Sequence, residues 1–478
     1  MTTLASTQQP PAALRRSRPQ AWRAAATATV WLTSLATLAL WVGGGGLQSI
    51  AALTPESLAS VARIAGLVSA NLLLLQVLLM ARVPLFERGF GRSGITRMHR
   101  LTGIWSVSLL AVHIVLIVAA YALQDGVNLI AEAWDVIWGS PGVFAASLGV
   151  IALIGVMASS ARRARQRLRY ETWHLLHLYA YFGVAISVPH MLLTGHEFVG
   201  NPVASWYWWT LWAVAAGCVL VFRMAVPLWR SARSRIRVAE VVSEGSRGVT
   251  VRLHGRGLHR LGARAGQHFV WRFLDGPGWS RGHPFSLSAA PTADRLQLSA
   301  RVVGDGTRRL ADLAPGTPVM IEGPYGSMTG AARTQPGLLM IGAGAGVAPL
   351  VAILEDEPFA PGEAVLVTRE RAAKETMLGE SIRRLITDRG LVHYTLLGPR
   401  AQGGPSWLPA QYAHHDGAEL LQSLAPGGAD GLARCDVYLC GPPAWMTAVQ
   451  HDLLAAGVAP AHLHTEHFTQ ERSTGGAS

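Results

Sequence analysis

Cysteine is scarce in this chain: its 478 residues include only Cys218, Cys435 and Cys440. These three form no Cys-x-x-Cys pair and no even framework, which argues against iron–sulfur clusters, structural zinc sites and a disulfide scaffold. Any electron transfer by this protein must therefore use carriers that cysteine does not bind.

Acidic side chains are nearly missing from the first 230 residues, whereas the remainder has the composition of an ordinary soluble protein. Over the whole chain 50% of the residues are hydrophobic and only 15% are charged. This division predicts a membrane half followed by a soluble half. The net charge of +12 does not indicate nucleic-acid binding, because the arginines lie at the ends of apolar runs rather than along one stripe.

Six apolar runs reach the length of about 20 residues that a helix needs to cross a bilayer. They lie near residues 24–43, 58–80, 99–121, 142–159, 172–193 and 206–229. The first run could alternatively be a cleaved signal peptide, because four arginines precede it. Only five spans would then remain, and the charge distribution would be inconsistent.

Basic residues gather on one side of these six runs. They lie in the N-terminal segment and in residues 82–100, 162–169 and 230–237, whereas the loops at 44–57, 122–141 and 194–205 contain no Lys or Arg. By the positive-inside rule, the sequence predicts a multi-pass protein of the cell membrane with both termini and the soluble half in the cytoplasm.

Two histidine pairs have matched spacing in the third and fifth runs. His99 and His113 are 14 residues apart, and His177 and His190 are 13 apart. Either interval is close to four helical turns, so the histidines of a pair share a helix face and differ in depth by about 20 Å. Since one span separates the two runs, they cross in the same direction, and His99 lies level with His177 and His113 with His190.

Each level can thus offer two imidazoles to one iron, which predicts two six-coordinate b-type haems. In the alternative interpretation, the histidines are interfacial or line a pathway. His174, one turn before His177, is the main competitor at the inner level.

Two further side chains of the spans have competing interpretations. Arg63, near the outer end of the second run, is a snorkelling side chain, or it holds an outer haem propionate or attracts an anionic acceptor. Trp105 is more simply a packing residue than an electron relay.

Short alternating strands begin after residue 237 and predict a small antiparallel β-barrel that extends to about residue 330. Its segment His283-Pro284-Phe285-Ser286 offers hydroxyl and main-chain groups beside an aromatic ring, which suits a flavin. The same segment could be an ordinary strand after a turn.

A glycine turn that opens a short helix follows Arg301. The amides of such a turn can hold phosphate, so Arg301, Gly306 and Thr307 are assigned to the FAD pyrophosphate. A capped surface helix is the alternative.

The last third alternates strand and helix, which predicts an α/β nucleotide-binding domain. A buried strand at 338–341 runs into a glycine-rich loop that opens a helix, a pattern typical of a dinucleotide pyrophosphate site. The candidate contacts in this loop are Gly342, Gly344, Gly346 and Pro349.

A later strand ends in Cys440-Gly441-Pro442 and is expected to bring a thiol to the nicotinamide at the carboxyl edge of the sheet. Cys440 could instead be a small buried hydrophobe. Arg369 follows the strand at 365–367, where an adenosine ribose would lie, and it favours NADPH over NADH only weakly.

Together these residues resemble the ferric reductase and NADPH oxidase superfamily, in which a six-helix haem domain is joined to a ferredoxin-NADP reductase-like module. The resemblance covers about residues 25–470 and implies that His99, His113, His177 and His190 are the haem ligands. It implies a flavin role for Ser286, a nicotinamide role for Cys440, and a role for Phe468 in covering the flavin. Ten residues follow Phe468, whereas relatives usually end close to it.

The predicted fold is a six-helix transmembrane haem bundle, an antiparallel β-barrel FAD domain and an α/β nucleotide-binding domain. The expected domains are a cytoplasmic tail, the membrane domain, the FAD domain and the NAD(P) domain, at residues 1–22, 23–230, 231–330 and 331–478 respectively. The expected activity is electron transfer from cytoplasmic NAD(P)H through FAD and two haems to a small extracytoplasmic acceptor, either a ferric chelate or dioxygen. A channel or transporter with a redox-sensing domain and a membrane-anchored flavin reductase are the alternatives.

Overall fold

The computed structural model describes residues 19–168, 170–195, 197–199, 201–276, 279, 281–399 and 406–467. These residues form two compact units, one helical unit that ends at Val226 and one mixed unit that begins at Pro227.

The described residues up to Ser234 contain six helices that are long and apolar enough to cross a membrane. The candidate spans are Ala21–Gly43, Pro55–Met80, Gly94–Asp125, Val143–Ser160, Thr172–Leu193 and Pro202–Ser234. All six predicted runs are therefore helical, and the chain is a multi-pass membrane protein.

The helices of this part have the following bounds: α1 (Pro19–Gly43), α2 (Gly46–Ala51), α3 (Pro55–Met80), α4 (Pro84–Asp125), α5 (Leu129–Gly139), α6 (Val143–Ser160), α7 (Arg162–Arg167), α8 (Tyr170–Thr194), α9 (Pro202–Cys218) and α10 (Val226–Ser234). A π-helical stretch at Val219–Ala225 joins α9 to α10. Gly91 interrupts α4 with a positive φ of 64°, so the membrane span begins after this break.

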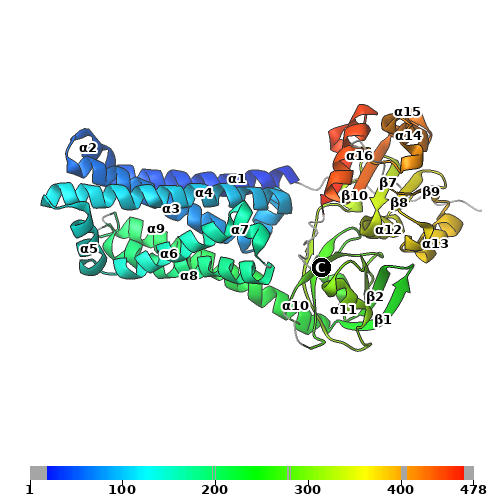
Figure 1. Ribbon diagram of the computed structural model, residues 1–478, viewed down its shortest axis with the longest axis horizontal. Coiled ribbons are helices and arrows are strands. Elements are labelled where there is room, and N and C mark those ends of the chain that lie inside the picture. The colour runs from blue at the N-terminus through cyan, green and yellow to red at the C-terminus, as the bar shows by residue number, and fades with distance from the viewer. Residues whose placement is uncertain are drawn as a thin grey trace, which may run out of the picture. The chain divides into compact units, whose positions relative to one another are not determined.

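The helices that carry the histidine pairs each pack against a neighbour. Helix α4 lies along α3, and α8 lies along α6 (Figure 1). Glycines allow the second contact, because a Cβ on Gly149 would lie 2.6 Å from the Gly183 carbonyl oxygen. Small residues at such crossings let two membrane helices approach closely.

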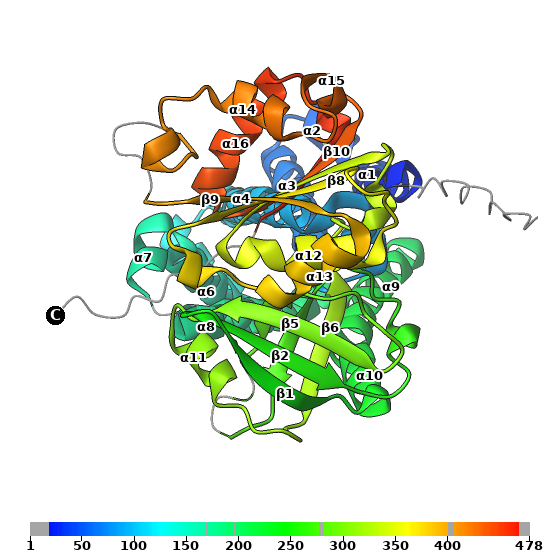
Figure 2. The ribbon, with the colours of Figure 1, turned by 90° about the vertical axis from the view of Figure 1, so that its right-hand side faces the viewer.

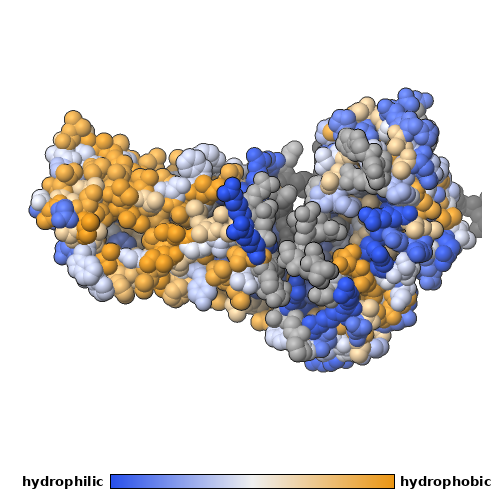
Figure 3. Space-filling view, viewed as in Figure 1, coloured by the Kyte–Doolittle hydropathy of each residue, from blue (hydrophilic) through white to orange (hydrophobic). Residues whose placement is uncertain are grey.

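The surface of the helical unit is largely apolar, and the mixed unit exposes many more hydrophilic residues (Figure 3). Exposed side chains of the spans include Trp105, Ile151 and Leu175. Burying such side chains in lipid is favourable, at about 25 cal/mol per Å² of apolar surface removed from water.

The first part of the mixed unit contains two antiparallel three-stranded sheets, ordered β1-β2-β5 and β4-β3-β6. The strands are β1 (Arg237–Glu244), β2 (Gly248–His254), β3 (His268–Phe273), β4 (His283–Ser286), β5 (Arg295–Arg301) and β6 (Val319–Tyr325), with helix α11 (Asp305–Ala311) after β5. Both sheets contribute to one core, which includes Val251, Trp271 and Leu298.

The predicted β-barrel is not confirmed, since neither of these sheets closes on itself in the described residues. Isolated bridges at Leu287–Leu298 and Arg237–Pro318 link the two sheets, and no continuous ladder between them is described. Irregular pairing at Val238/Glu240 and at His268/Val270 interrupts the ladders, and such irregularities bend a strand and end regular pairing.

The second part of the mixed unit is a five-stranded parallel sheet in the order β11-β10-β7-β8-β9. Its elements are β7 (Gly337–Ala343), α12 (Val347–Asp356), β8 (Ala364–Glu370), α13 (Gly379–Arg389), β9 (Val392–Leu397), α14 (Gly417–Leu424), α15 (Ala429–Leu432), β10 (Cys435–Gly441), α16 (Pro443–Ala455) and β11 (Leu463–His467).

Helices cover both faces of this sheet, with α12 and α13 on one side and α14 and α16 on the other (Figure 2). Alternate residues of one strand enter opposite cores: Leu338 and Met340 face α12, and Leu339 and Ile341 face α16. Strands buried on both faces explain the continuous apolar runs in this part of the sequence.

Candidate functional site

The structure brings His99 of α4 and His177 of α8 together. Their ring centroids lie 6.0 Å apart, with 67° between the ring planes. A metal–imidazole bond is about 2.0–2.1 Å long, so two rings at roughly this separation can reach one metal ion between them. The Nδ1 atom of His99 is buried and has no hydrogen-bond partner among the described residues.

The second pair lies four turns farther along the same two helices. An electrostatic interaction links His190 to His113. The Nδ1 atom of His113 lies 2.8 Å from the carbonyl oxygen of Ala62 in α3. Because a carbonyl can only accept a hydrogen bond, Nδ1 carries the proton, and Nε2 keeps the lone pair that a metal requires.

The facing rings of His99 and His177 therefore fit one haem, and His113 has the orientation of a metal ligand; a second haem at His113 and His190 stays a prediction. The predicted competitor His174 interacts electrostatically with His177, but the ring that contacts His99 is that of His177. Ser160 lies 3.3 Å from the Nδ1 atom of His177 and can orient that ring.

Arg63 forms an ion pair with Glu56 about two turns earlier in α3, and its side chain is largely buried. The carboxylate of Glu56 thus binds the guanidinium, which in a snorkelling arginine would be bound by water. Trp105 is 62% exposed on the surface of α4, which fits lipid contact rather than a relay between histidines.

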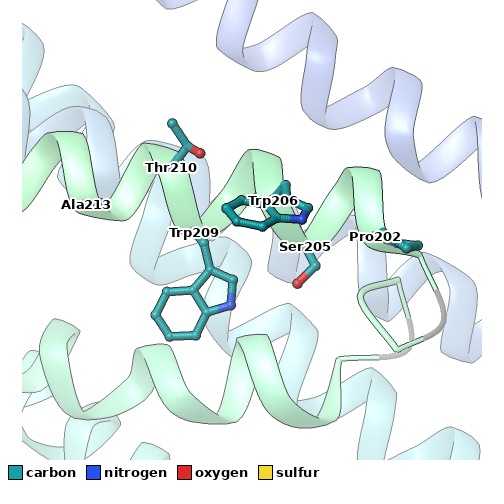
Figure 4. Close-up of a pocket in the computed structure, with 6 residues that line it drawn as sticks. All are labelled: Pro202, Ser205, Trp206, Trp209, Thr210 and Ala213. Atoms are coloured by element: carbon teal, nitrogen blue, oxygen red, sulfur yellow. The ribbon is translucent and has the colours of Figure 1, made fainter.

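A shallow groove on α9 is lined by Pro202, Ser205, Trp206, Trp209, Thr210 and Ala213 (Figure 4). All six residues belong to one helix, and Trp206 and Trp209 are exposed. Exposed tryptophans on a membrane helix are typical of contact with lipid at the headgroup level.

The predicted flavin segment His283–Ser286 is strand β4. The Ser286 hydroxyl is buried and has no hydrogen-bond partner among the described residues, so it is available to a ligand. The rings of His283 and Phe285 are stacked with centroids 6.1 Å apart, and Pro284 between them is exposed. A Cβ on Gly306 would lie 2.8 Å from the His283 ring, so this glycine brings the α11 turn against β4.

His283 gives a pH-dependent prediction. Burial, and then the nearby Arg281 and Arg309, lower the pKa of His283 from 6.5 to about 4. As the pH falls from 6.5 towards 4, the unfolded chain binds a proton that the folded chain does not, so stability should decrease through this window. We expect His283→Gln to reduce this decrease in thermal melts of the full-length protein followed by flavin fluorescence. The matched control is His259→Gln at an exposed histidine, and an equal pH dependence in both variants would contradict the prediction.

Arg301 lies at the end of β5 and forms ion pairs with the second part of the same unit. Its Nη2 atom is 2.5 Å from Glu370 and its Nη1 atom is 3.3 Å from Glu375. Its buried Nε has no hydrogen-bond partner among the described residues, so this nitrogen is available to donate to an additional acceptor. Thr307 caps α11, because its hydroxyl accepts hydrogen bonds from the amides of Val303 and Gly304, as in the capped-helix interpretation.

The glycine-rich loop after β7 lies where the strand order of the parallel sheet reverses. Strands β8 and β10 flank β7 on opposite sides, so the crevice at the carboxyl ends of β7 and β10 is the topological switch point where such sheets bind ligands. Near the end of β7, Gly342 pairs with Cys440 of β10. A Cβ on Gly346 would lie 2.3 Å from the Cys440 carbonyl oxygen, and Pro349 is buried in the first turn of α12.

Cys440 is fully buried, and its thiol lies 3.6 Å from the Glu466 carbonyl oxygen of β11. Burial raises the pKa of this thiol well above its ordinary value, so it is neutral at neutral pH. Gly441 and Pro442 follow; a Cβ on Gly441 would press against Trp445, and Pro442 is the N-cap of α16. Phe468 lies outside the described residues.

Arg369 and Thr368 end β8, next to the glycine loop. Arg369 donates a hydrogen bond to the Glu370 carbonyl oxygen at 2.5 Å, and the buried Thr368 hydroxyl lies 2.9 Å from the Nε2 atom of His393. They pair with Gly342 and Ala343 at the start of the loop, and the ribose contact stays a prediction.

Three contacts of these sites were not predicted from sequence: Ala62 and Gly66 against His113, the two glutamates that bind Arg301, and the pair formed by His268 and Glu466. In the last pair, His268 Nδ1 lies 3.7 Å from Glu466 Oε1, and His268 pairs with Ser286 in the β3–β4 register. Residue counting could have identified Gly66, since it lies a similar number of residues from the start of α3 as His113 does from the end of α4.

Comparison with known proteins finds the ferric reductase like transmembrane component over residues 65–188. The chain is 27% identical to NADPH oxidase 1 of Mus musculus over 166 residues, covering 33% of this chain and 26% of that protein. It is 28% identical to the ferredoxin reductase component of 3-ketosteroid-9-alpha-monooxygenase of Mycolicibacterium smegmatis over 217 residues, covering 44% of this chain and 56% of that protein.

Among solved structures, the FAD/NAD-binding domain of nitric oxide dioxygenase from Vibrio cholerae O1 biovar El Tor is 20% identical, with a TM-score of 0.38, covering 49% of this chain and 99% of that one. The chain thus matches about a quarter of the length of the oxidase and just over half of the reductase. The matched segment covers the whole of α4 and most of α8, so it includes His99, His113 and His177 and ends before His190. By this match and its sequence relatives, the chain is similar to members of the ferric reductase and NADPH oxidase superfamily.

Proposed function

We propose that this protein is an NAD(P)H-dependent oxidoreductase that moves electrons across the membrane, through one FAD and two b-type haems, to a small extracytoplasmic acceptor. The acceptor is a ferric chelate, which would become Fe(II), or dioxygen, which would become superoxide. The observation that carries this proposal is the facing arrangement of His99 with His177 on two parallel spans, with His113 and His190 four turns away.

The four histidines would each give one imidazole nitrogen to iron, two to each haem. When bound, the haems supply one-electron carriers, and FAD converts a hydride into single electrons. The chain's contribution is to fix these groups: the Ala62 carbonyl holds the proton of His113 on Nδ1, and Ser160 lies beside the corresponding atom of His177.

In the soluble half, Ser286 and the β4 backbone would face the flavin, with Arg301, Gly306 and Thr307 near its pyrophosphate. The loop residues Gly342, Gly344, Gly346 and Pro349 would hold the pyrophosphate of NAD(P)H, and Arg369 its ribose. Cys440 would lie against the nicotinamide as a neutral, water-excluding thiol, because it is fully buried at the strand end.

The distribution of arginines supports a cytoplasmic location for both termini and for the FAD and NAD(P) domains, at residues 231–330 and 331–478. NAD(P)H would then donate electrons on the cytoplasmic side, and the loops without Lys or Arg would face the acceptor.

The test is a reduced-minus-oxidised optical spectrum of detergent-purified protein after anaerobic addition of NADPH, with haem and flavin quantified per chain. We expect two b-type haems per chain, both reduced through one FAD. Flavin-loaded protein without haem would contradict the proposal and favour a redox sensor or an anchored reductase.

A further inference from the structure

We infer that Gly66 of α3 is a positioning residue for His113. It provides the space in which the imidazole lies against α3 and donates its Nδ1 proton to Ala62. This inference rests on the proposed function, because it concerns the ligand of one of the two proposed haems. Helix α3 itself contains no histidine.

The contact between α3 and the His113 ring leaves no room for a larger residue at position 66. A Cβ on Gly66 would lie 2.7 Å from Nδ1 of His113 and 3.0 Å from Cγ and Cε1. Cβ atoms do not normally come closer than 3.0 Å to another heavy atom. An alanine would therefore displace the ring or spread α3 from α4, which pack along each other.

Gly66 and Ala62 act together because they are four residues apart, on the same face of the helix. The Ala62 carbonyl oxygen accepts the Nδ1 proton at 2.8 Å, and Gly66 lets the ring approach to that distance. Moving the ring away by a few tenths of an ångström would lengthen this hydrogen bond and turn the Nε2 lone pair.

The two histidines of α4 differ in this respect. His113 has a carbonyl acceptor for Nδ1, whereas the buried Nδ1 of His99 has no hydrogen-bond partner among the described residues. A hydrogen bond from the outer ring nitrogen makes a ligating imidazole more basic, and a more basic ligand favours the oxidised metal. We therefore expect Gly66 to lower the midpoint potential of the His113–His190 haem and to leave that of the His99–His177 haem unchanged.

The experiment compares wild type, Gly66→Ala and a matched control, Gly155→Ala, in purified full-length protein. Gly155 lies in α6, a membrane span, and a Cβ there would meet nothing within 4 Å. The measurements are haem and FAD per chain, potentiometric titration of the haem absorbance and low-temperature electron paramagnetic resonance of the oxidised haems.

In Gly66→Ala we expect one haem to change and the other to keep its potential and spectrum. The changed haem should have a higher midpoint potential and altered resonance values, or it should be lost because its affinity decreases about 10- to 100-fold. Gly155→Ala should match wild type. Gly66→Ala protein with both haems bound and both potentials unchanged would overturn the inference.

If Gly66→Ala does not accumulate, the wild type itself still tests the inference. Electron–nuclear double resonance in H₂O and D₂O should detect a strongly hydrogen-bonded exchangeable ligand proton on one of the two haems, and its absence on both would overturn the inference. Wild-type protein that contains no haem would instead contradict the proposed function, so the two failures are distinguishable.

Discussion

His177→Ala should lose one of the two proposed haems and interrupt electron transfer across the membrane. The ring of His177 contacts that of His99, so alanine leaves His99 without its partner ring. The remaining haem, at His113 and His190, would lie about 20 Å from this level, given the rise of a helix over 13 residues. We expect delivery of electrons to an external acceptor to decrease about a hundredfold or more, equivalent to about 2.7 kcal/mol of barrier.

The measurements are haem per chain and reduction of an impermeant ferric chelate or dioxygen by proteoliposomes supplied with NADPH. NADPH oxidation with a soluble dye should continue, because the flavin and nucleotide residues belong to the other compact unit. The matched control is His174→Ala, which removes a histidine one turn earlier in the same helix. If His174→Ala loses haem and His177→Ala does not, the ligand assignment at this level is wrong.

Residue spacing was sufficient to predict the spans and the histidine pairs. A helix has a fixed rise and repeat, so intervals of 13 and 14 residues place two histidines on one face, and the alternation of loops gives the two spans the same direction. The structure accordingly brings the ring of His177 to that of His99. The alternation of apolar strands with helices likewise predicted β7 and β10, with Gly342 and Cys440 near their ends.

Contacts between elements far apart in sequence were not predictable in the same way. The β-barrel was inferred from short alternating strands, but the pattern does not encode whether β1 and β6 form a ladder or only the single bridge at Arg237. The phosphate assignment of Arg301 followed from a nearby glycine turn. Its pairing with Glu370 and Glu375 depends on how β5 lies against the end of β8, which local sequence does not specify.

Gly346→Ala should impair the use of NAD(P)H. The backbone of Gly346 is right-handed helical, with φ −65° and ψ −12°, so alanine can adopt this conformation. The added Cβ would lie 2.3 Å from the carbonyl oxygen of Cys440 and 2.8 Å from the amide nitrogen of Gly441. Both are backbone atoms, so no side-chain rotation can relieve the contact.

The loop and the end of β10 must then separate at the topological switch point, where the nucleotide would bind. Overpacking of this kind costs about 1–3 kcal/mol, which we expect to appear as a rate of flavin reduction by NADPH about 10- to 100-fold lower in anaerobic stopped-flow measurements. Chemical reduction with dithionite should still reduce the haems fully, because the histidines lie in the other unit.

The matched control for this substitution is Gly379→Ala at the start of α13. There the nearest atom to an added Cβ is the Nη1 atom of Arg383 at 3.5 Å, an ordinary contact with a flexible side chain. Equal flavin reduction in Gly346→Ala and Gly379→Ala would mean that the nucleotide does not bind between β7 and β10. If Gly346→Ala contains the normal amount of FAD but its flavin is reduced slowly, the defect lies in NADPH binding or hydride transfer. The residues proposed to contact FAD lie outside the glycine loop, on β4, β5 and α11.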